Sequence, residues 1–192
     1  SLTMDLTIVI PAYNEEKRLP PTLARVLNFM TAHYQGTYEI VVVDDGSKDG
    51  TDKSVEIFIA KYPNVRLIRQ QQNKGRGIAV REGVHTARGE LILEMDADGS
   101  VHEEAIVRFV EYMDQHADID MLIGSRNIAG ARIVVPQPLV RRVLGYVFFT
   151  IAMVLFGWWD FKDRVNGFKM FRKRAADDIF AYQRETGFLA EA

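Results

Sequence analysis

The chain has 192 residues, of which 47% are hydrophobic and 26% are charged, and its formal net charge is -2. These values are typical of a globular protein with one sizeable core, so we expect a main domain followed by a C-terminal appendage. The sequence contains no cysteine, which excludes disulfides, zinc-thiolate sites and a cysteine nucleophile. We also expect no nucleic-acid partner.

The first 124 residues alternate between apolar runs and amphipathic patterns. Short runs rich in Val, Ile and Leu predict strands at 6–10, 38–43, 65–69, 90–95 and 119–123. Helices are expected between them, beginning at Pro20-Pro21 and then covering 51–60, 77–86 and 103–116. This alternation indicates an α/β fold with a parallel sheet and right-handed crossover connections. The pattern ends after Gly124, and we expect residues 1–125 to form the α/β core.

A charge asymmetry divides the chain near residue 125. Residues 1–125 carry 13 Lys and Arg against 20 Asp and Glu, whereas residues 126–174 carry 10 against 2. The second segment includes Val143 to Trp159, 17 residues without a charge. Its length, its cationic flanks and its paired tryptophans leave three interpretations open: a buried or homodimer-forming helix, a helix at a membrane interface, or a membrane span, which needs about 20 residues.

Polar side chains follow three of the predicted strands. Residues 11–15 follow the first strand, Asp44-Asp45-Gly46-Ser47 follows the second, and Asp96-Ala97-Asp98 follows the run that ends at Met95. In an open parallel sheet, ligands bind at this edge. Two neighbouring carboxylates are best tolerated when they share Mg²⁺ or Mn²⁺ with the phosphates of a substrate. The sequence therefore predicts transfer from a nucleotide diphosphate.

Six segments, taken in order, resemble the family 2 inverting glycosyltransferases of GT-A fold over nearly the whole chain. They are IVIPAYNE, VVVDDGSKDGT, NKGRG, MDADG, GSR and Asp163-x-x-x-Gly167-Phe168-Lys169. The last segment, with the basic and apolar stretch before it, is most similar to the polyprenyl-phosphate branch, which contains dolichyl-phosphate mannose and glucose synthases. The resemblance implies a GT-A type, Rossmann-like sheet with a C-terminal amphipathic or apolar helical appendage.

The same resemblance implies a metal-dependent hexosyltransferase. It would move mannose or glucose from a UDP- or GDP-hexose to a polyprenyl or dolichyl phosphate, with inversion, as a peripheral protein at the cytoplasmic face of a membrane. Residues 126–192 would then form the acceptor and membrane-interface segment and the C-terminal completion of the domain. The segment ends inside a region that continues in relatives, so we expect the catalytic unit to be truncated. The donor sugar stays open, because residues 95–100 fit neither synthase pattern fully.

Roles for individual residues also follow from the resemblance. The residues expected to bind the nucleotide are Pro11, Tyr13, Glu15, Val43, Asp45, Lys74, Asp96 and Ala97, with Arg76 a further candidate for neutralising phosphate charge. The expected metal ligands are Asp96, Asp98 and Ser100. The expected catalytic residues are Asp98 and Asp163, the latter as a base, as a group that orients an arginine, or as a turn cap. The expected acceptor-phosphate ligands are Arg126 and one of Arg141 and Arg142.

Several alternatives stay open beside this reading. Lys74 and Arg76 are equally compatible with a solvated loop, and Arg141-Arg142 with an exposed cluster or a lipid headgroup contact. A family 2 transferase acting on a soluble or polysaccharide sugar acceptor would not need the basic and apolar segment. A nucleotidyltransferase would carry a Gly-rich, lysine-bearing first loop where this chain has residues 11–15. A noncatalytic binding protein is disfavoured by the two aspartates at 96 and 98.

Overall fold

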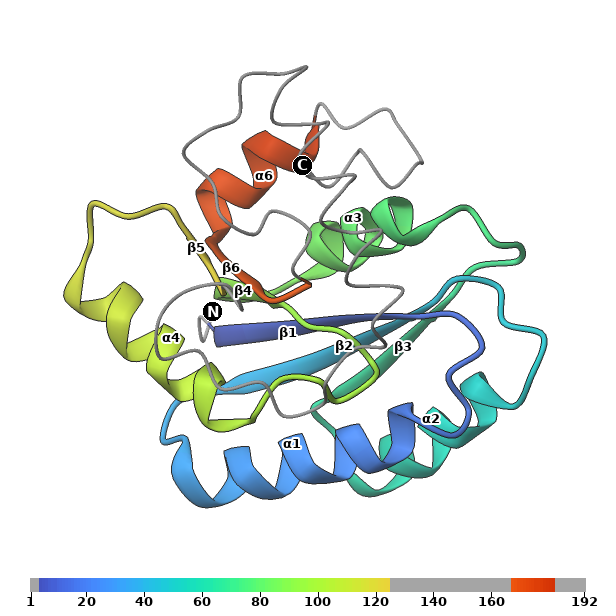
Figure 1. Ribbon diagram of the computed structural model, residues 1–192. Coiled ribbons are helices and arrows are strands. Elements are labelled where there is room, and N and C mark those ends of the chain that lie inside the picture. The colour runs from blue at the N-terminus through green and yellow to red at the C-terminus, as the bar shows by residue number, and fades with distance from the viewer. Residues whose placement is uncertain (1–3, 125–166, 182–192) are drawn as a thin grey trace, which may run out of the picture.

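The computed structural model describes residues 4–124 and 167–181. A six-stranded sheet lies between two layers of helices (Figure 1). The strands are β1 (Met4–Ala12), β2 (Tyr38–Asp44), β3 (Val65–Arg69), β4 (Gly89–Glu94), β5 (Met121–Ile123) and β6 (Lys169–Arg172). The helices are α1 (Leu19–His33), α2 (Thr51–Lys61), α3 (Arg76–Thr86), α4 (Glu104–Gln115) and α6 (Lys173–Ala181). The five strands and four helices expected before residue 124 are confirmed, with boundaries shifted by one or two residues.

Four strands form the parallel part of the sheet, in the order β3-β2-β1-β4. Ile8 of the central strand β1 lies between Ile40 of β2 and Leu93 of β4. All three side chains are fully buried, because helices cover both faces of the sheet. This is why the interiors of these strands read as apolar runs.

The other end of the sheet is mixed, so the expected parallel sheet is extended by antiparallel pairing. Strand β6 pairs antiparallel with β4 on one side and with β5 on the other. It therefore separates two strands that follow each other in the first 124 residues. Neither β6 nor helix α6 was predicted. Only four residues long and charged at both ends, β6 gives little sequence signal, and its partners lie about 50 to 80 residues earlier in the chain.

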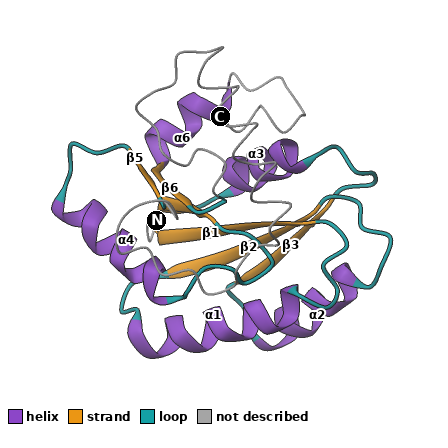
Figure 2. Ribbon diagram, viewed as in Figure 1, coloured by secondary structure: helices purple, strands orange, loops and turns teal. Residues whose placement is uncertain are grey.

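Figure 2 shows helices on both faces of the sheet, and these two layers bury alternate residues of the same strands. Leu6, Ile8 and Ile10 of β1 pack in the core under α1, α2 and α4, whereas Val9 packs in the core under α3 and α6. This alternation is the two-residue period of a strand buried on both faces. The site is thereby confined to the edge where the strands end, because both faces of the sheet are covered.

Several expectations fall outside the described residues. These are the apolar stretch Val143 to Trp159 and the candidate site residues Asp163, Arg126, Arg141 and Arg142. Within residues 4–124 and 167–181, no helix combines the length and the apolar character needed to cross a bilayer.

Candidate active site

The loops after β1 and β2 are joined by hydrogen bonds at the C-terminal edge of the sheet. The main-chain N–H of Asn14 donates to the Ser47 hydroxyl at 2.9 Å, and the N–H of Lys48 donates back to the Asn14 side-chain carbonyl at 2.9 Å. The N–H of Glu15 donates to Thr51 Oγ1 at 2.8 Å. Asn14 has a φ of 56°, a conformation that asparagine tolerates better than most residues. The two loops therefore form one fixed wall of the site.

Asp45 fixes the third loop, between β3 and α3. Its two carboxylate oxygens accept the main-chain N–H groups of Lys74 at 2.8 Å and Gly75 at 3.0 Å. The residue is only 3% exposed, so these bonds satisfy a carboxylate that burial would otherwise destabilise. Asp45 thus holds the NKGRG segment in place, a role that the sequence did not indicate, and its contact with a nucleoside stays a prediction. Lys74 itself is exposed at this loop.

Among the nucleotide candidates on β1 and β2, only Tyr13 presents a large apolar side chain to solvent. Tyr13 is 40% exposed just after β1 ends, so its ring can offer a flat face to a base. Pro11 is buried, and Val43 is fully buried in the core beneath α3. These two residues are therefore part of the packed interior beneath the edge.

Glu15 lies beside Tyr13 in a site rich in carboxylates. Burial is the main cause that raises the pKa of Glu15 above its ordinary value, and the negative charges of Asp98 and Asp49 raise it further. Arg18 opposes this shift, donating to Glu15 Oε1 at 2.5 Å and to Oε2 at 2.7 Å. Because β1 and β4 are neighbouring parallel strands, the carboxylates that follow them lie at the same edge of the sheet, and the charge of Asp98 contributes to the shift at Glu15.

The Asp-x-Asp segment directly follows β4. Asp98 is exposed, and its Oδ1 accepts the main-chain N–H of Ser100 at 2.9 Å. Ala97 between the aspartates is only 5% exposed, whereas Asp96 is partly exposed and Asp98 is exposed. Gly99 has a φ of 68°, and a side chain there would press on Thr22 of α1. Local turn geometry therefore fixes the position of Asp98.

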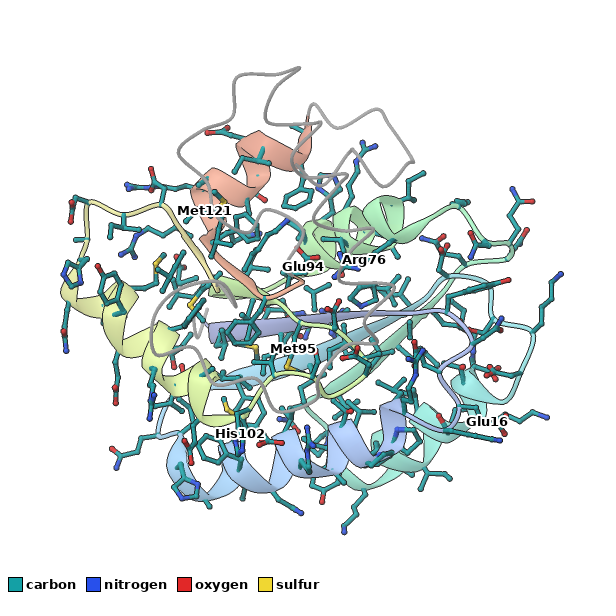
Figure 3. The ribbon with its side chains drawn as sticks, in the orientation of Figure 1. Glu16, Arg76, Glu94, Met95, His102 and Met121 are labelled. Carbon is teal, nitrogen blue, oxygen red and sulfur yellow. The ribbon has the colours of Figure 1, made fainter. Side chains whose placement is uncertain are left out.

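Asp96 is held by an arginine from α3. The Arg76 guanidinium donates through Nη2 to Asp96 Oδ1 at 2.6 Å and through Nη1 to the carboxylate of Glu94. Figure 3 shows Arg76 and Glu94 side by side beneath α3. The Glu94 side chain is 4% exposed, whereas those of Arg76 and Asp96 are about one-third exposed. The sequence suggested a phosphate contact for Arg76 but gave no sign of its pairing with Glu94 and Asp96.

Gly167 borders the same carboxylate from the opposite part of the chain. A Cβ built on this glycine would lie closer than 3.0 Å to three atoms of the Asp96 side chain. Gly167 comes just before β6, which pairs with β4 and so brings the two segments together. The Gly-Phe-Lys segment therefore owes its glycine to a close approach to Asp96. Spacing alone could not reveal this contact.

The donor set can accept a hard divalent cation. Two aspartates one residue apart supply carboxylate oxygens at an open edge, and Mg²⁺ or Mn²⁺ commonly completes its shell with water and substrate phosphates. Among the described residues, no group of three or more His, Cys, Asp or Glu side chains is arranged to hold a metal by itself.

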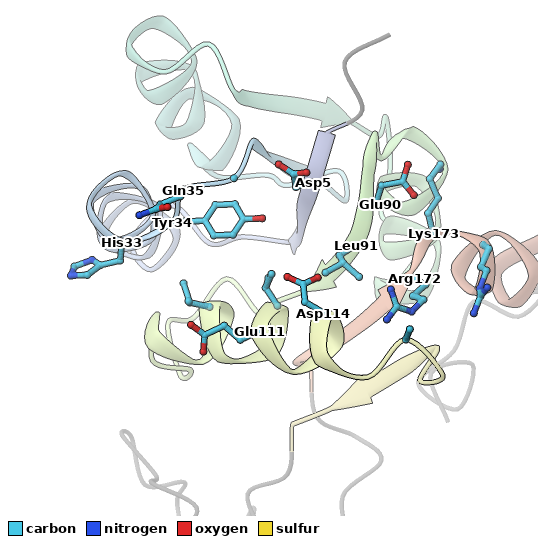
Figure 4. A pocket seen from close by; sticks show the side chains of 15 residues that line it. Asp5, His33, Tyr34, Gln35, Glu90, Leu91, Glu111, Asp114, Arg172 and Lys173 are labelled. Carbon is cyan, nitrogen blue, oxygen red and sulfur yellow. The ribbon is translucent and has the colours of Figure 1, made fainter.

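A separate cleft lies at the opposite, N-terminal edge of the sheet. Figure 4 shows it between the C-terminal ends of α1 and α4, with Asp5, Tyr34 and Asp114 among its lining residues. Arg172 also lines it and donates to the main-chain carbonyls of Met113 and His116 at the end of α4. None of the predicted site residues within 4–124 lines this cleft, so we place the active site at the C-terminal edge.

Comparison with known proteins agrees with this architecture. The sequence model of glycosyl transferase family 2 matches residues 7–180. A dolichyl-phosphate beta-glucosyltransferase of Dictyostelium discoideum is 35% identical over 186 residues, which cover 91% of this chain and 56% of that protein. The chain thus spans about half the length of the curated relatives it matches.

Two solved structures share the fold at low sequence identity. Glucosyl-3-phosphoglycerate synthase from Mycobacterium tuberculosis, in complex with Mn²⁺, UDP-glucose and phosphoglyceric acid, is 18% identical with a TM-score of 0.66, covering 89% of this chain and 57% of that one. A mannosyltransferase from Pyrobaculum calidifontis, in complex with GDP-mannose and Mn²⁺, is 18% identical with a TM-score of 0.61, covering 91% and 46%. They confirm the predicted GT-A fold.

Proposed function

The chain belongs to glycosyl transferase family 2, and we propose that it carries the donor-binding core of an enzyme that transfers a hexose, with inversion, to a polyprenyl or dolichyl phosphate. The observation that carries the proposal is the meeting of Tyr13, Glu15, Asp96 and Asp98 at one edge of a GT-A sheet. The names of the curated relatives, dolichyl-phosphate beta-glucosyltransferases, support a lipid phosphate as the acceptor and disfavour a soluble sugar acceptor.

The relatives also support glucose as the hexose, carried by a nucleoside diphosphate. Tyr13 would stack on the base, and Glu15 would accept hydrogen bonds from the base or ribose. Asp96 and Asp98 would hold Mg²⁺ or Mn²⁺ together with the diphosphate, with Ser100 nearby. When bound there, the metal would supply positive charge that stabilises the departing nucleoside diphosphate. The Mn²⁺ in the two solved structures supports a divalent cation without choosing between the two metals.

The acceptor phosphate is already anionic at neutral pH, so it needs positioning more than proton removal. Arg126 and one of Arg141 and Arg142 would hold it in line with the sugar C1, because arginine forks match phosphate oxygens. The apolar stretch Val143 to Trp159 would place this segment at the cytoplasmic face of a membrane, beside the lipid carrier. Asp163 would serve the same region as a base or by orienting an arginine.

The decisive experiment is calorimetric titration with UDP, UDP-glucose and GDP-mannose, each with and without Mn²⁺. We expect metal-dependent binding, tighter for the uridine nucleotides. Asp98→Asn keeps the shape of the side chain but removes one charge, so it should weaken binding in the presence of Mn²⁺ by about tenfold or more. A protein that remains folded, by circular dichroism, is required for this comparison.

The matched control is Asp118→Asn, which removes the same charge from an exposed residue between α4 and β5, at the opposite edge of the sheet. It should leave the affinity unchanged. If Asp98→Asn binds UDP with Mn²⁺ as tightly as the unchanged protein, the assignment of the metal site is wrong. Binding of GDP-mannose in preference to UDP-glucose would instead replace glucose by mannose and leave the site in place.

A further inference from the structure

Arg76 occupies a position where one cation serves two carboxylates. It is the first residue of α3, and the preceding Gly75 has a φ of 97°, which directs the chain into the helix. From there its guanidinium reaches the end of β4, donating to both Glu94 and Asp96. A guanidinium can bridge two carboxylates in this way because its donors point in fixed, separate directions.

The two carboxylates need this cation for different reasons. Glu94 is buried, and an ionised carboxylate without a partner there would be costly. Asp96 is partly exposed and is the carboxylate that the proposed function assigns to the metal. Its Oδ1 is already occupied by Arg76, and Gly167 lies against the same group. A divalent cation approaching Asp96 therefore meets a positive charge bound to one of its intended ligands.

We infer that Arg76 is a positioning residue that holds Asp96 in the absence of metal and competes with the divalent cation for this carboxylate. The inference rests on the proposed function, because it takes Asp96 as a metal ligand. It goes further because it states that Arg76 lowers the affinity of the site for the divalent cation. The guanidinium orders Asp96 and prevents repulsion between the carboxylates of Glu94, Asp96 and Asp98, and it thereby makes metal binding without nucleotide weak. The negative charge of a nucleoside diphosphate offsets the repulsion between the Arg76 guanidinium and the divalent cation, so metal and donor bind together.

The test is the affinity for Mn²⁺ alone, measured by water-proton relaxation, which does not depend on turnover. Arg76→Gln removes the positive charge and keeps a polar side chain. We expect Mn²⁺ to bind about tenfold more tightly, because a unit charge beside a divalent ion is removed in a partly screened site. A role limited to anchoring α3 predicts the opposite, since a loosened Asp96 would bind Mn²⁺ more weakly.

Two variants serve as controls, one for the position of the removed charge and one for the charge at position 76. Arg69→Gln removes a charge from the same edge of the sheet, where the Arg69 guanidinium pairs with Glu56 and Asp52. It should leave Mn²⁺ affinity unchanged. Arg76→Lys keeps the charge beside Asp96 and should stay near the affinity of the unchanged protein; an increase equal to that of Arg76→Gln would overturn the charge argument.

Folding of Arg76→Gln is supported by the sheet register, which places Lys169 of β6 opposite Glu94. If the variant nevertheless fails to fold, Arg76→Gln combined with Glu94→Gln removes the buried charge with its partner. This double variant, compared with Glu94→Gln alone, should again bind Mn²⁺ more tightly. An unchanged or weaker affinity in the folded variants overturns the inference about Arg76. If Asp96→Asn binds Mn²⁺ as tightly as the unchanged protein, the proposed metal site is wrong instead.

Discussion

Replacing Gly167 with alanine is expected to weaken metal-dependent nucleotide binding without unfolding the core. The new Cβ would lie closer than 3.0 Å to the Asp96 carboxylate, whereas ordinary van der Waals contact begins at 3.4 Å. The φ of Gly167 is not in the left-handed region, so the backbone itself accepts alanine. The strain therefore falls on the end of the Asp96 side chain, which is about one-third exposed and can withdraw toward solvent only by giving up its bond to Arg76.

The size of the effect follows from the geometry of metal ligands. The Asp96 carboxylate has to withdraw by about 1 Å, which exceeds what a Mg²⁺ or Mn²⁺ shell with oxygens at about 2.0 to 2.2 Å can absorb. Losing the alignment of one ligand in this way typically costs about 10- to 100-fold in metal affinity. The same movement breaks the bond at 2.6 Å from Arg76 to Asp96, while the bond from Arg76 to Glu94 remains.

The assay is calorimetric titration of UDP in the presence of saturating Mn²⁺, accompanied by urea unfolding. Gly83→Ala is the matched control, because a Cβ at Gly83 would lie closer than 3.0 Å to Val9 in the core between α3 and β1. That variant should lose about 1 to 3 kcal/mol in its free energy of unfolding and keep its nucleotide affinity. Gly167→Ala should instead keep its free energy of unfolding and lose nucleotide affinity. Unchanged metal-dependent affinity in folded Gly167→Ala would refute the proposed role of Asp96 in binding the metal.

Two further predictions concern the membrane segment and the far cleft. The protein should cosediment with vesicles that contain anionic lipid, and high salt should weaken this binding. Replacing both Trp158 and Trp159 with serine should reduce vesicle binding without changing nucleotide affinity. If the protein does not bind vesicles at low salt, a buried or dimer-forming helix is favoured. Burial, with smaller contributions from the charges of Asp5 and Asp114, raises the pKa of Tyr34 to about 12 from 10. The Tyr34 hydroxyl therefore stabilises the fold fully below about pH 10 and loses this contribution as the pH rises toward 12. The difference in the free energy of unfolding between the unchanged protein and Tyr34→Phe, measured with urea, should shrink over that range. A difference that stays constant with pH would contradict this.

Much of this protein could be predicted from local patterns in the sequence. The strands β1 to β4 are apolar runs because both of their faces are buried, and each run ends where the chain leaves the covered sheet. The clusters at 11–15, 44–47 and 96–98 therefore had to meet at one edge, since parallel strands end on the same side. Proline at the first positions of α1 and the amphipathic helices were equally local signals. These features depend on neighbours within a few residues, which is why the sequence alone determined them.

The contacts that complete the site depend instead on residues far apart in the chain. Strand β6 entered between β4 and β5 because of antiparallel pairing with a strand about 80 residues earlier, and no short pattern specifies that partner. This pairing alone brings Gly167 against Asp96. In the same way, Arg76 met Glu94 and Asp96, and Asp45 met the loop before α3, only once the sheet had placed β2, β3 and β4 in register. Only the tertiary structure decided these contacts, because a side chain's partner across the sheet is set by strand order and register rather than by its own neighbours in sequence.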